Sequence, residues 1–235
     1  MPCAPLCPPS QSQDAPGETN AELILRTCNS NGTLLQPSKP ITACDSTHDA
    51  NGGPDGYALN TYTSIGGKIW MRYLVTHQLK TPFSVMSLDL YPMIDDGAYA
   101  YTSWDSLLSG HPDYTINGAP PRSPHDVLFT LPAVAAGDDP FYPTLTLIVP
   151  SHPLGGFSFL GEYTKFATIS EARFPSEMQF TPTGIEFTMA GTTGETVSLA
   201  WWSFTNVMKY NNVTLTASRA HCTINTDAIS CVAAE

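Results

Sequence analysis

Basic residues are scarce in this sequence, and no two of them are adjacent. Lys and Arg together number 10 in 235 residues, against 21 Asp and Glu, which gives a formal net charge of −11 at pH 7. Binding to a nucleic acid backbone depends on clustered Lys and Arg, and so does attraction to an anionic membrane surface. We therefore expect neither nucleic acid nor an anionic membrane among the partners.

Long apolar runs and helix signals are also missing. No apolar run approaches the roughly 18 residues that a membrane-spanning helix needs, so we expect no membrane insertion. The 21 prolines would interrupt most long helices. The one helix candidate is residues 104–109, for which Ser103 or Asp105 is a suitable cap.

What the sequence does contain is a series of short strand-like runs with turn residues every 8–12 positions, the pattern of a sandwich or barrel. In the strongest run, residues 68–77, large apolar residues alternate along the chain. We expect residues 83–91 to form a hairpin-like pair with it, and residues 185–189 and 196–203 to form a hairpin around 191–194. The other expected strands are 21–26, 127–131, 145–149, 157–160, 165–169, 213–217, 220–224 and 228–232.

This pattern predicts an all-β fold with almost no helix, as an antiparallel β-sandwich of the jelly-roll or immunoglobulin-like type. Two small β units are the alternative. Residues 1–20 carry five prolines and are expected to be an extended tail before a β domain spanning 21–235. Residues 117–124 are either an internal boundary or a loop that crosses between sheets. We favour the loop, because the strands before it are too few to close a core.

Six cysteines and the absence of any Cys-x-x-Cys spacing favour three disulfides and an oxidising compartment. One bridge follows from register. A turn centred on Thr226 and Asp227 places Cys222 opposite Cys231, close enough for a bond. Proximity in sequence alone suggests the other two pairs, Cys28–Cys44 and Cys3–Cys7.

Two glycosylation sequons begin at Asn31 and Asn212. The low charged fraction, 13%, is about half the usual share, and a surface built from uncharged polar residues is typical of extracellular proteins. Together with the cysteines, these features predict a secreted or surface-exposed glycoprotein.

The stretch that follows residues 83–91 combines aromatic rings with carboxylates. Sugar-binding sites use this combination, because a ring stacks on the apolar face of a pyranose while carboxylates accept hydrogen bonds from hydroxyls. The alternative is that these rings fill the end of the core. The predicted ligand-binding residues are Asp95, Asp96, Tyr99, Tyr101, Trp104 and Asp105.

Asp49, Asn51 and Asp55 form a Gly-rich acidic segment that resembles part of a calcium loop. The match to an EF-hand fails, and plain Asx-Gly turns have the same composition. Calcium is the only cofactor that the sequence suggests. No residue is identified as catalytic: candidate carboxylates such as Glu162 and Glu195 are present, but no spacing marks a pair.

Three functions remain open at this stage. The first is a secreted, non-catalytic module that binds carbohydrate through the aromatic and acidic loop. The second is a structural or interaction subunit of a surface, coat or filament assembly, whose partner is another extracellular protein or further copies of itself. The third is a carbohydrate hydrolase or an accessory domain of one.

Overall fold

The computed structural model describes residues 20–44, 56–94, 97–110, 115–117, 121–133 and 143–234. Strands make up 47% of it and helices 7%, and the sheets are antiparallel. The prediction of an all-β fold with little helix is therefore confirmed. The jelly-roll or immunoglobulin-like sandwich stays a prediction. In the described ranges, no helix has both the length and the apolar character to cross a membrane.

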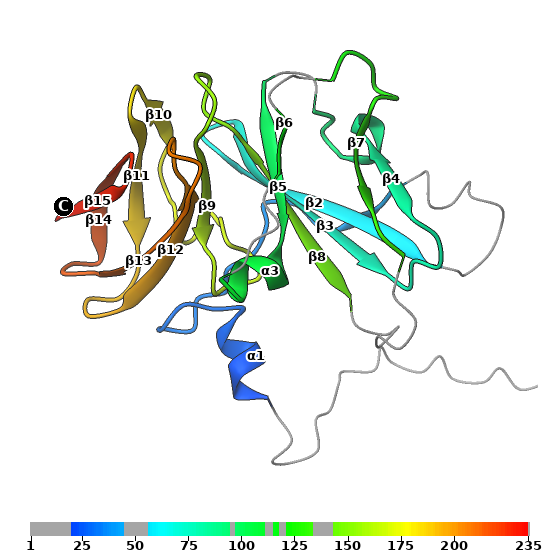
Figure 1. The fold of residues 1–235 in the computed structure, drawn as a ribbon. Coiled ribbons are helices and arrows are strands. Elements are labelled where there is room, and N and C mark those ends of the chain that lie inside the picture. The colour runs from blue at the N-terminus through cyan, green and yellow to red at the C-terminus, as the bar shows by residue number, and fades with distance from the viewer. Residues whose placement is uncertain are drawn as a thin grey trace, which may run out of the picture.

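The described strands form four sheets (Figure 1). The first has six strands, in the order β1 (Thr42–Ala43), β2 (Tyr57–Ile65), β3 (Lys68–His77), β8 (Thr144–Pro150), β5 (Tyr99–Ser103) and β6 (Thr115–Asn117). The second joins β10 (Gln179–Thr181), β11 (Gly184–Ala190), β14 (Arg219–Asn225) and β15 (Ala228–Ala233). The third joins β13 (Met208–Thr214), β12 (Thr196–Trp202) and β9 (Ser158–Glu162), and the fourth joins β4 (Phe83–Met86) and β7 (Val127–Leu131). The described helices are short: α1 (Ala21–Leu25), the 3₁₀ turn η1 (Ser87–Asp89) and α3 (Trp104–Leu108).

The six-stranded sheet is covered on both faces. Successive side chains of a strand point to opposite faces. Accordingly, Tyr73 and Leu147 lie in a large core cluster shared with β9, β11, β12 and β14, whereas Leu74 and Ile148 lie in a smaller cluster shared with β4 and β7. This explains why residues 147–149 of β8 are apolar in succession instead of alternating with polar ones. In Figure 1 the strands up to β8 lie at the right and those from β9 onward at the left.

The sequence identified strands better than it identified their partners. Residues 68–77 and 127–131 are strands with the expected bounds, and the expected helix is α3, capped by a hydrogen bond from Ser106 N to Ser103 Oγ (3.1 Å). The strand expected at 21–26 is wrong: it is helix α1, whose first turn is capped by the side chain of Asn20. Residues 165–169 form a series of bends instead of a strand.

Two hairpins that the sequence predicted are wrong: residues 68–77 do not pair with 83–91, and residues 185–189 do not pair with 196–203. Strand β4 pairs with β7 rather than β3, and β11 pairs with β10 and β14 while β12 pairs with β9 and β13. The connection between β11 and β12 also bonds to the connection between β13 and β14: Gly191 N donates to Ser218 O (3.0 Å) and Gly194 N to Leu215 O (2.8 Å). The chain therefore leaves one sheet at this turn and enters another.

Strand β2 was not predicted, because it is rich in polar residues. Several of these are buried and satisfied within the protein. Thr63 Oγ1 donates to Ile169 O (2.8 Å), and Asn60 Nδ2 donates to Asp89 O (3.1 Å). Hydrogen bonds of this kind make buried polar side chains tolerable in a central strand.

The Cys222–Cys231 disulfide is confirmed together with its register. The pairs that link β14 to β15 run from Asn225–Ala228 to Cys222–Cys231, where the two Cα atoms are 4.1 Å apart. The Cys28–Cys44 bridge is wrong. Cys28 Sγ lies against Ile24 O at the end of α1 (3.5 Å), whereas Cys44 is buried in the smaller cluster near Asn60. Cys3 and Cys7 lie outside the described residues, as does the expected tail up to residue 19.

The segment 117–124 connects β6, in the six-stranded sheet, with β7, in the two-stranded sheet. Residues 118–120 are outside the described part. Whether the segment is a crossing loop within one domain or a boundary between two therefore stays a prediction.

Gly161 provides a test of the packing between β9 and the loop that follows it. Its φ is +81°, and a Cβ at this position would lie 2.2 Å from Thr168 O. We expect Gly161→Ala to lower the free energy of unfolding by roughly 3 kcal/mol or more, because the costs of backbone strain and overpacking add.

Gly194→Ala is the matched control, since the φ of Gly194 is also positive (+88°) but no atom lies within 4 Å of the position its Cβ would take. It should cost about 1–2 kcal/mol. Urea unfolding measures both, and equal losses would contradict the close approach at Gly161.

Candidate functional site

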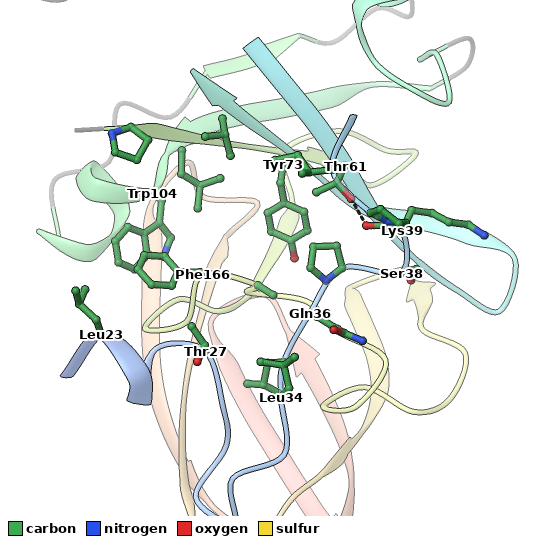
Figure 2. Close-up of a pocket in the computed structure, with 18 of the residues that line it drawn as sticks. Leu23, Thr27, Leu34, Gln36, Ser38, Lys39, Thr61, Tyr73, Trp104 and Phe166 are labelled. Atoms are coloured by element: carbon green, nitrogen blue, oxygen red, sulfur yellow. Dashed lines mark hydrogen bonds between the residues drawn. The ribbon is translucent and has the colours of Figure 1, made fainter. Parts of the chain in front are cut away.

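An apolar pocket of about 730 Å³ lies between α1, residues 34–41, α3 and one face of strands β3 and β8 (Figure 2). We call it the apolar pocket. Its floor includes Tyr73, Trp104 and Phe166, and its outer wall is the segment 34–41, which we call the wall segment. Its volume is in the range of small-molecule sites.

The wall segment, Leu34 to Ile41, is tied to the body of the protein at both ends. Leu35 is buried, and its N–H donates to Thr27 O (2.8 Å). Further along, Ser38 N donates to Tyr62 O (3.0 Å) and Thr61 Oγ1 donates to Lys39 O (2.6 Å). Its two prolines favour an extended backbone without internal hydrogen bonds. The segment is thus held by the edge of β2.

The floor of the apolar pocket satisfies its own polar atoms. Trp104 Nε1 donates to Tyr163 O (3.1 Å) and Lys165 O (2.9 Å). The Tyr73 hydroxyl donates to Ile169 O (2.7 Å) and accepts from Ile169 N (3.0 Å). Burial raises the pKa of Tyr73 to about 12, although the bond to Ile169 acts in the opposite direction. The floor therefore offers a ligand mainly apolar surface.

Aromatic and cationic contacts fix the indole of Trp104 in place. The ring of Phe166 lies 4.8 Å from it, tilted by 40°, and the Arg26 guanidinium lies 5.2 Å from its centroid. Arg26 also acts on the next residue, Asp105, which lines the same pocket. Partial desolvation raises the pKa of Asp105, and the positive charge of Arg26 partly offsets this effect. Among the described residues that line the pocket, Asp105 is the one acidic group.

Exposed apolar side chains surround the opening. Leu23, Leu34 and Ile41 line the pocket, yet they remain 47%, 54% and 49% exposed. Figure 2 shows Leu23 on α1 and Leu34 on the wall segment around the cavity, while the side chain of Lys39 points away from it. A ligand that covers this rim removes apolar area from water at about 25 cal/mol per Å².

The structure divides the sequence-predicted sugar site between two faces. Tyr99 is buried in the smaller cluster, where its hydroxyl donates to Leu128 O (3.2 Å), and Tyr101 stacks on Phe129 with centroids 4.1 Å apart. Trp104 belongs to the large cluster on the other face. The rings of Tyr99 and Trp104 thus fill cores, as the alternative interpretation expected, and they form no shared platform.

The other predicted ligand-binding and metal-binding residues are acidic or amide side chains, and the structure describes only one of them. Asp105 lines the apolar pocket, whereas Asp95 and Asp96 lie outside the described residues. The suggested calcium ligands Asp49, Asn51 and Asp55 also lie outside them. Across the described ranges, no group of three or more His, Cys, Asp or Glu side chains is arranged to hold a metal ion.

Both sequons are exposed, at Asn31 and at Asn212 on β13. The side-chain oxygen of Asn31 accepts hydrogen bonds from the amide (2.9 Å) and hydroxyl (2.6 Å) of Thr33. Glycosylation at either position stays a prediction.

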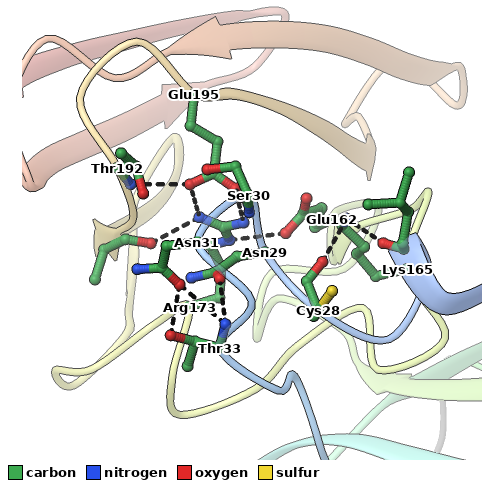
Figure 3. Close-up of polar contacts among 12 residues, drawn as sticks. Cys28, Asn29, Ser30, Asn31, Thr33, Glu162, Lys165, Arg173, Thr192 and Glu195 are labelled. Carbon is green, nitrogen blue, oxygen red and sulfur yellow. Dashed lines mark hydrogen bonds and ion pairs between the residues drawn. The ribbon is translucent and has the colours of Figure 1, made fainter.

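A buried ion triad lies close to the first sequon (Figure 3). The Arg173 guanidinium donates from Nε to Glu162 Oε2 (2.8 Å), from Nη2 to Glu195 Oε1 (2.7 Å) and from Nη1 to Ala190 O (2.7 Å). All three charged side chains are at most 6% exposed. Glu195 Oε1 also accepts the amide of Ser30 (3.0 Å), so the triad holds the N-terminal segment in place.

The two carboxylates of the triad have pKa values shifted in opposite directions. Burial raises the pKa of Glu162 more than Arg173 lowers it. Burial acts on Glu195 too, but hydrogen bonds from Arg173, Thr192 and Ser30 more than offset it and lower its pKa to about 2. Catalytic carboxyl pairs show such a split. Here, however, both groups bind a buried arginine, and neither lines the apolar pocket, so the triad acts as a structural element.

Sequence reasoning missed most of the pocket. Tyr73, Phe166 and the wall segment come from separate parts of the chain, and only the paired leucines and two prolines of residues 34–41 give any signal of an apolar, extended segment. Comparison with known proteins adds nothing to the geometry, because no protein-family model, curated protein or solved structure matches this chain.

Glu195 contributes to stability in a way that depends on pH in a defined direction. The pKa of Glu195 falls from 4.5 to about 2 on folding, so the stabilisation from its charged form is complete above pH 4.5 and is lost as the pH falls towards 2. We expect Glu195→Gln to lower the free energy of unfolding at pH 7 by about 1.5–3 kcal/mol, the value of hydrogen bonds to a charged group. Denaturant titrations should show this difference shrinking between pH 4.5 and 2.

Glu177→Gln is the control for this experiment. It removes the same charge from an exposed pair with Lys68 (3.4 Å) and should change stability by at most about 0.5 kcal/mol. A loss in Glu195→Gln that is the same at pH 3 and pH 7 would show that the charge of Glu195 does not stabilise the fold.

Proposed function

We propose that this protein is a secreted or surface-exposed, non-catalytic binding protein, and that its ligand is a mainly apolar small molecule held in the apolar pocket. One observation carries this proposal. A cavity of about 730 Å³ has an aromatic floor whose polar atoms are already bonded to the main chain. A large apolar cavity with a few polar groups is the usual form of a ligand site.

The lining favours binding over hydrolysis. A glycosidase needs two carboxylates on either side of the bond it cleaves, and among the lining residues Asp105 is the only carboxylate. The buried hydroxyl of Tyr73 is bonded to Ile169 in both directions and has a raised pKa, so it is a poor acid or base at neutral pH. The placement of these two groups therefore supports the proposal of binding over that of hydrolysis.

The lining also favours an apolar ligand over a sugar within this pocket. Each sugar hydroxyl that loses water needs a new hydrogen-bond partner. The polar atoms of the floor rings of Trp104 and Tyr73 are bonded to the main chain, and the rim includes exposed leucine and isoleucine side chains. An aliphatic or aromatic body gains from all of these surfaces.

The extracellular part of the proposal is supported by two features. The Cys222–Cys231 disulfide is a bond that persists in oxidising compartments. The sequons at Asn31 and Asn212 are both exposed and so accessible to modification.

A second candidate function, an interaction subunit, is favoured by helix α1. Leu23, Ile24 and Leu25 follow one another on this helix and are 47%, 51% and 58% exposed. Contiguous exposed apolar side chains are typical of protein interaction sites. Light scattering over a range of concentrations distinguishes the two candidates, because assembly supports the subunit and a monomer that binds ligand supports the pocket.

Filling the pocket tests the main proposal. Val75 on β3 lines it opposite Leu145 on β8, so a tryptophan at position 75 would occupy the cavity. We expect the neutral fluorophore N-phenyl-1-naphthylamine to bind saturably to the unmodified protein, and Val75→Trp to weaken that binding at least about ten-fold, or 1.4 kcal/mol. Fluorescence titration measures both affinities.

Val127→Trp is the matched control, because Val127 is also on a strand but is 57% exposed on β7. It should leave the affinity within two-fold. Near-ultraviolet circular dichroism checks that both variants are folded. The pocket proposal fails if the fluorophore does not bind to the unmodified protein, or if both variants bind it equally well.

A further inference from the structure

Asp105 places an unpaired negative charge at the apolar pocket. It is the one acidic side chain among the described lining residues, and it remains exposed although the preceding residue, Trp104, is buried in the floor. Within the described ranges, its carboxylate accepts no hydrogen bond and forms no ion pair. A carboxylate has about four acceptor sites, so these are available to a ligand that occupies the pocket.

The positive charges around Asp105 already have partners. Arg26, whose charge acts on Asp105, forms an ion pair with Glu22 one turn earlier on α1. Lys165, whose carbonyl oxygen accepts from Trp104, uses its own ammonium group to donate to two main-chain carbonyls, at 2.6 and 2.7 Å. Of these charged groups, Asp105 is therefore the one left to pair with a ligand.

The cation of the pocket lining does not compete for the same ligand group. Lys39 is the one basic residue among the described lining residues. It belongs to the wall segment, and Figure 2 shows its side chain directed away from the cavity and from Trp104. A cationic group on the floor side of the pocket therefore finds an opposite charge in Asp105, whereas an anionic group would need Lys39 to turn inward.

The partial desolvation of Asp105 also favours a positive partner. The loss of water raises the pKa of this carboxyl, and the charge of Arg26 offsets the rise only in part. A second positive charge close by would stabilise the ionised form further. Because the side chain is still exposed, an ammonium that binds it keeps contact with water, which avoids the cost of burying a charge.

We infer that the ligand of the apolar pocket is an amphiphilic amine, whose apolar body lies against Trp104 and Phe166 and whose ammonium group binds the carboxylate of Asp105. This inference rests on the proposed function and adds the chemical class of the ligand to it. An ammonium donates charge-assisted hydrogen bonds, which are roughly twice as strong as those of a neutral hydroxyl. Trp104 and Asp105 are adjacent in the chain and both line the pocket, so one molecule can contact the floor and the carboxylate together.

Ligands that share one chain and differ in charge test the inference. Decylamine, which is protonated at neutral pH, 1-decanol and decanoate are used below their micelle-forming concentrations to displace N-phenyl-1-naphthylamine from the unmodified protein. We expect decylamine to bind at least about ten-fold more tightly than decanol, as a hydrogen bond to a charged group allows. Decanoate should bind more weakly than decanol, because it brings a second negative charge to Asp105.

Isosteric variants locate the ammonium group. Asp105→Asn should weaken the binding of decylamine by about ten-fold and leave decanol within two-fold, because only the amine uses the carboxylate. Asp227→Asn is the matched control: it removes the same charge from the turn between β14 and β15, where Asp227 pairs with Lys209 (3.3 Å) and lies outside the pocket lining. It should change neither affinity, which separates Asp105 from the general attraction of an acidic protein for cations. Near-ultraviolet circular dichroism shows whether both variants are folded.

The outcomes separate this inference from the proposed function. If decanol binds as tightly as decylamine, or if Asp105→Asn leaves decylamine unaffected, the amine assignment is overturned while the apolar pocket stands. Equal losses in Asp105→Asn and Asp227→Asn would overturn it as well, because the attraction would then come from overall charge. Tighter binding of decanoate would assign an anionic ligand instead and overturn it too. Failure of the fluorophore and decanol to bind at all would overturn both the inference and the proposed function.

Discussion

The fold depends on the guanidinium of Arg173, which is buried among elements that are distant in sequence. It binds Glu162 at the end of β9, Ala190 O at the end of β11 and Glu195 before β12. Leaving a buried charge without its partner costs about 3–5 kcal/mol, so these strands cannot separate without a large penalty. Glu195 also accepts the amide of Ser30, and the chain continues from there into the wall segment. The position of that wall therefore depends on an ion triad that does not itself line the pocket.

The loop that follows β9 shows how irregular backbone is used to build a site. Buried carbonyl and amide groups must find partners, and in this loop the partners are side chains from the six-stranded sheet and from α3. Tyr73 takes both polar groups of Ile169, and Trp104 takes the carbonyls of Tyr163 and Lys165. Both rings are thus held by the same loop, and together with Phe166 they line the floor of the pocket.

The sequence predicted what depends on local pattern. Alternation located β3, and counting outward from one turn gave the Cys222–Cys231 register. Strand partners were missed, because apolar alternation marks a buried face without saying which strand lies beside it. The candidate site was predicted only in part: Trp104 and Asp105 line the apolar pocket, but Tyr99 and Tyr101 do not. Tyr99 and Trp104 are five residues apart, an odd spacing, so alternation along the strand directs the two rings to opposite faces of the sheet and into different cores.

The chemistry of the pocket follows from where its polar atoms are directed. In an enzyme, buried donors and acceptors are aimed at the reacting atoms before the substrate arrives. Here the strongest polar groups, those of Tyr73 and Trp104, are aimed at the main chain and stabilise the fold instead. What remains for a ligand on the floor is mainly the apolar surface of these rings. This distribution of polar atoms supports the proposal that the pocket binds a mainly apolar ligand.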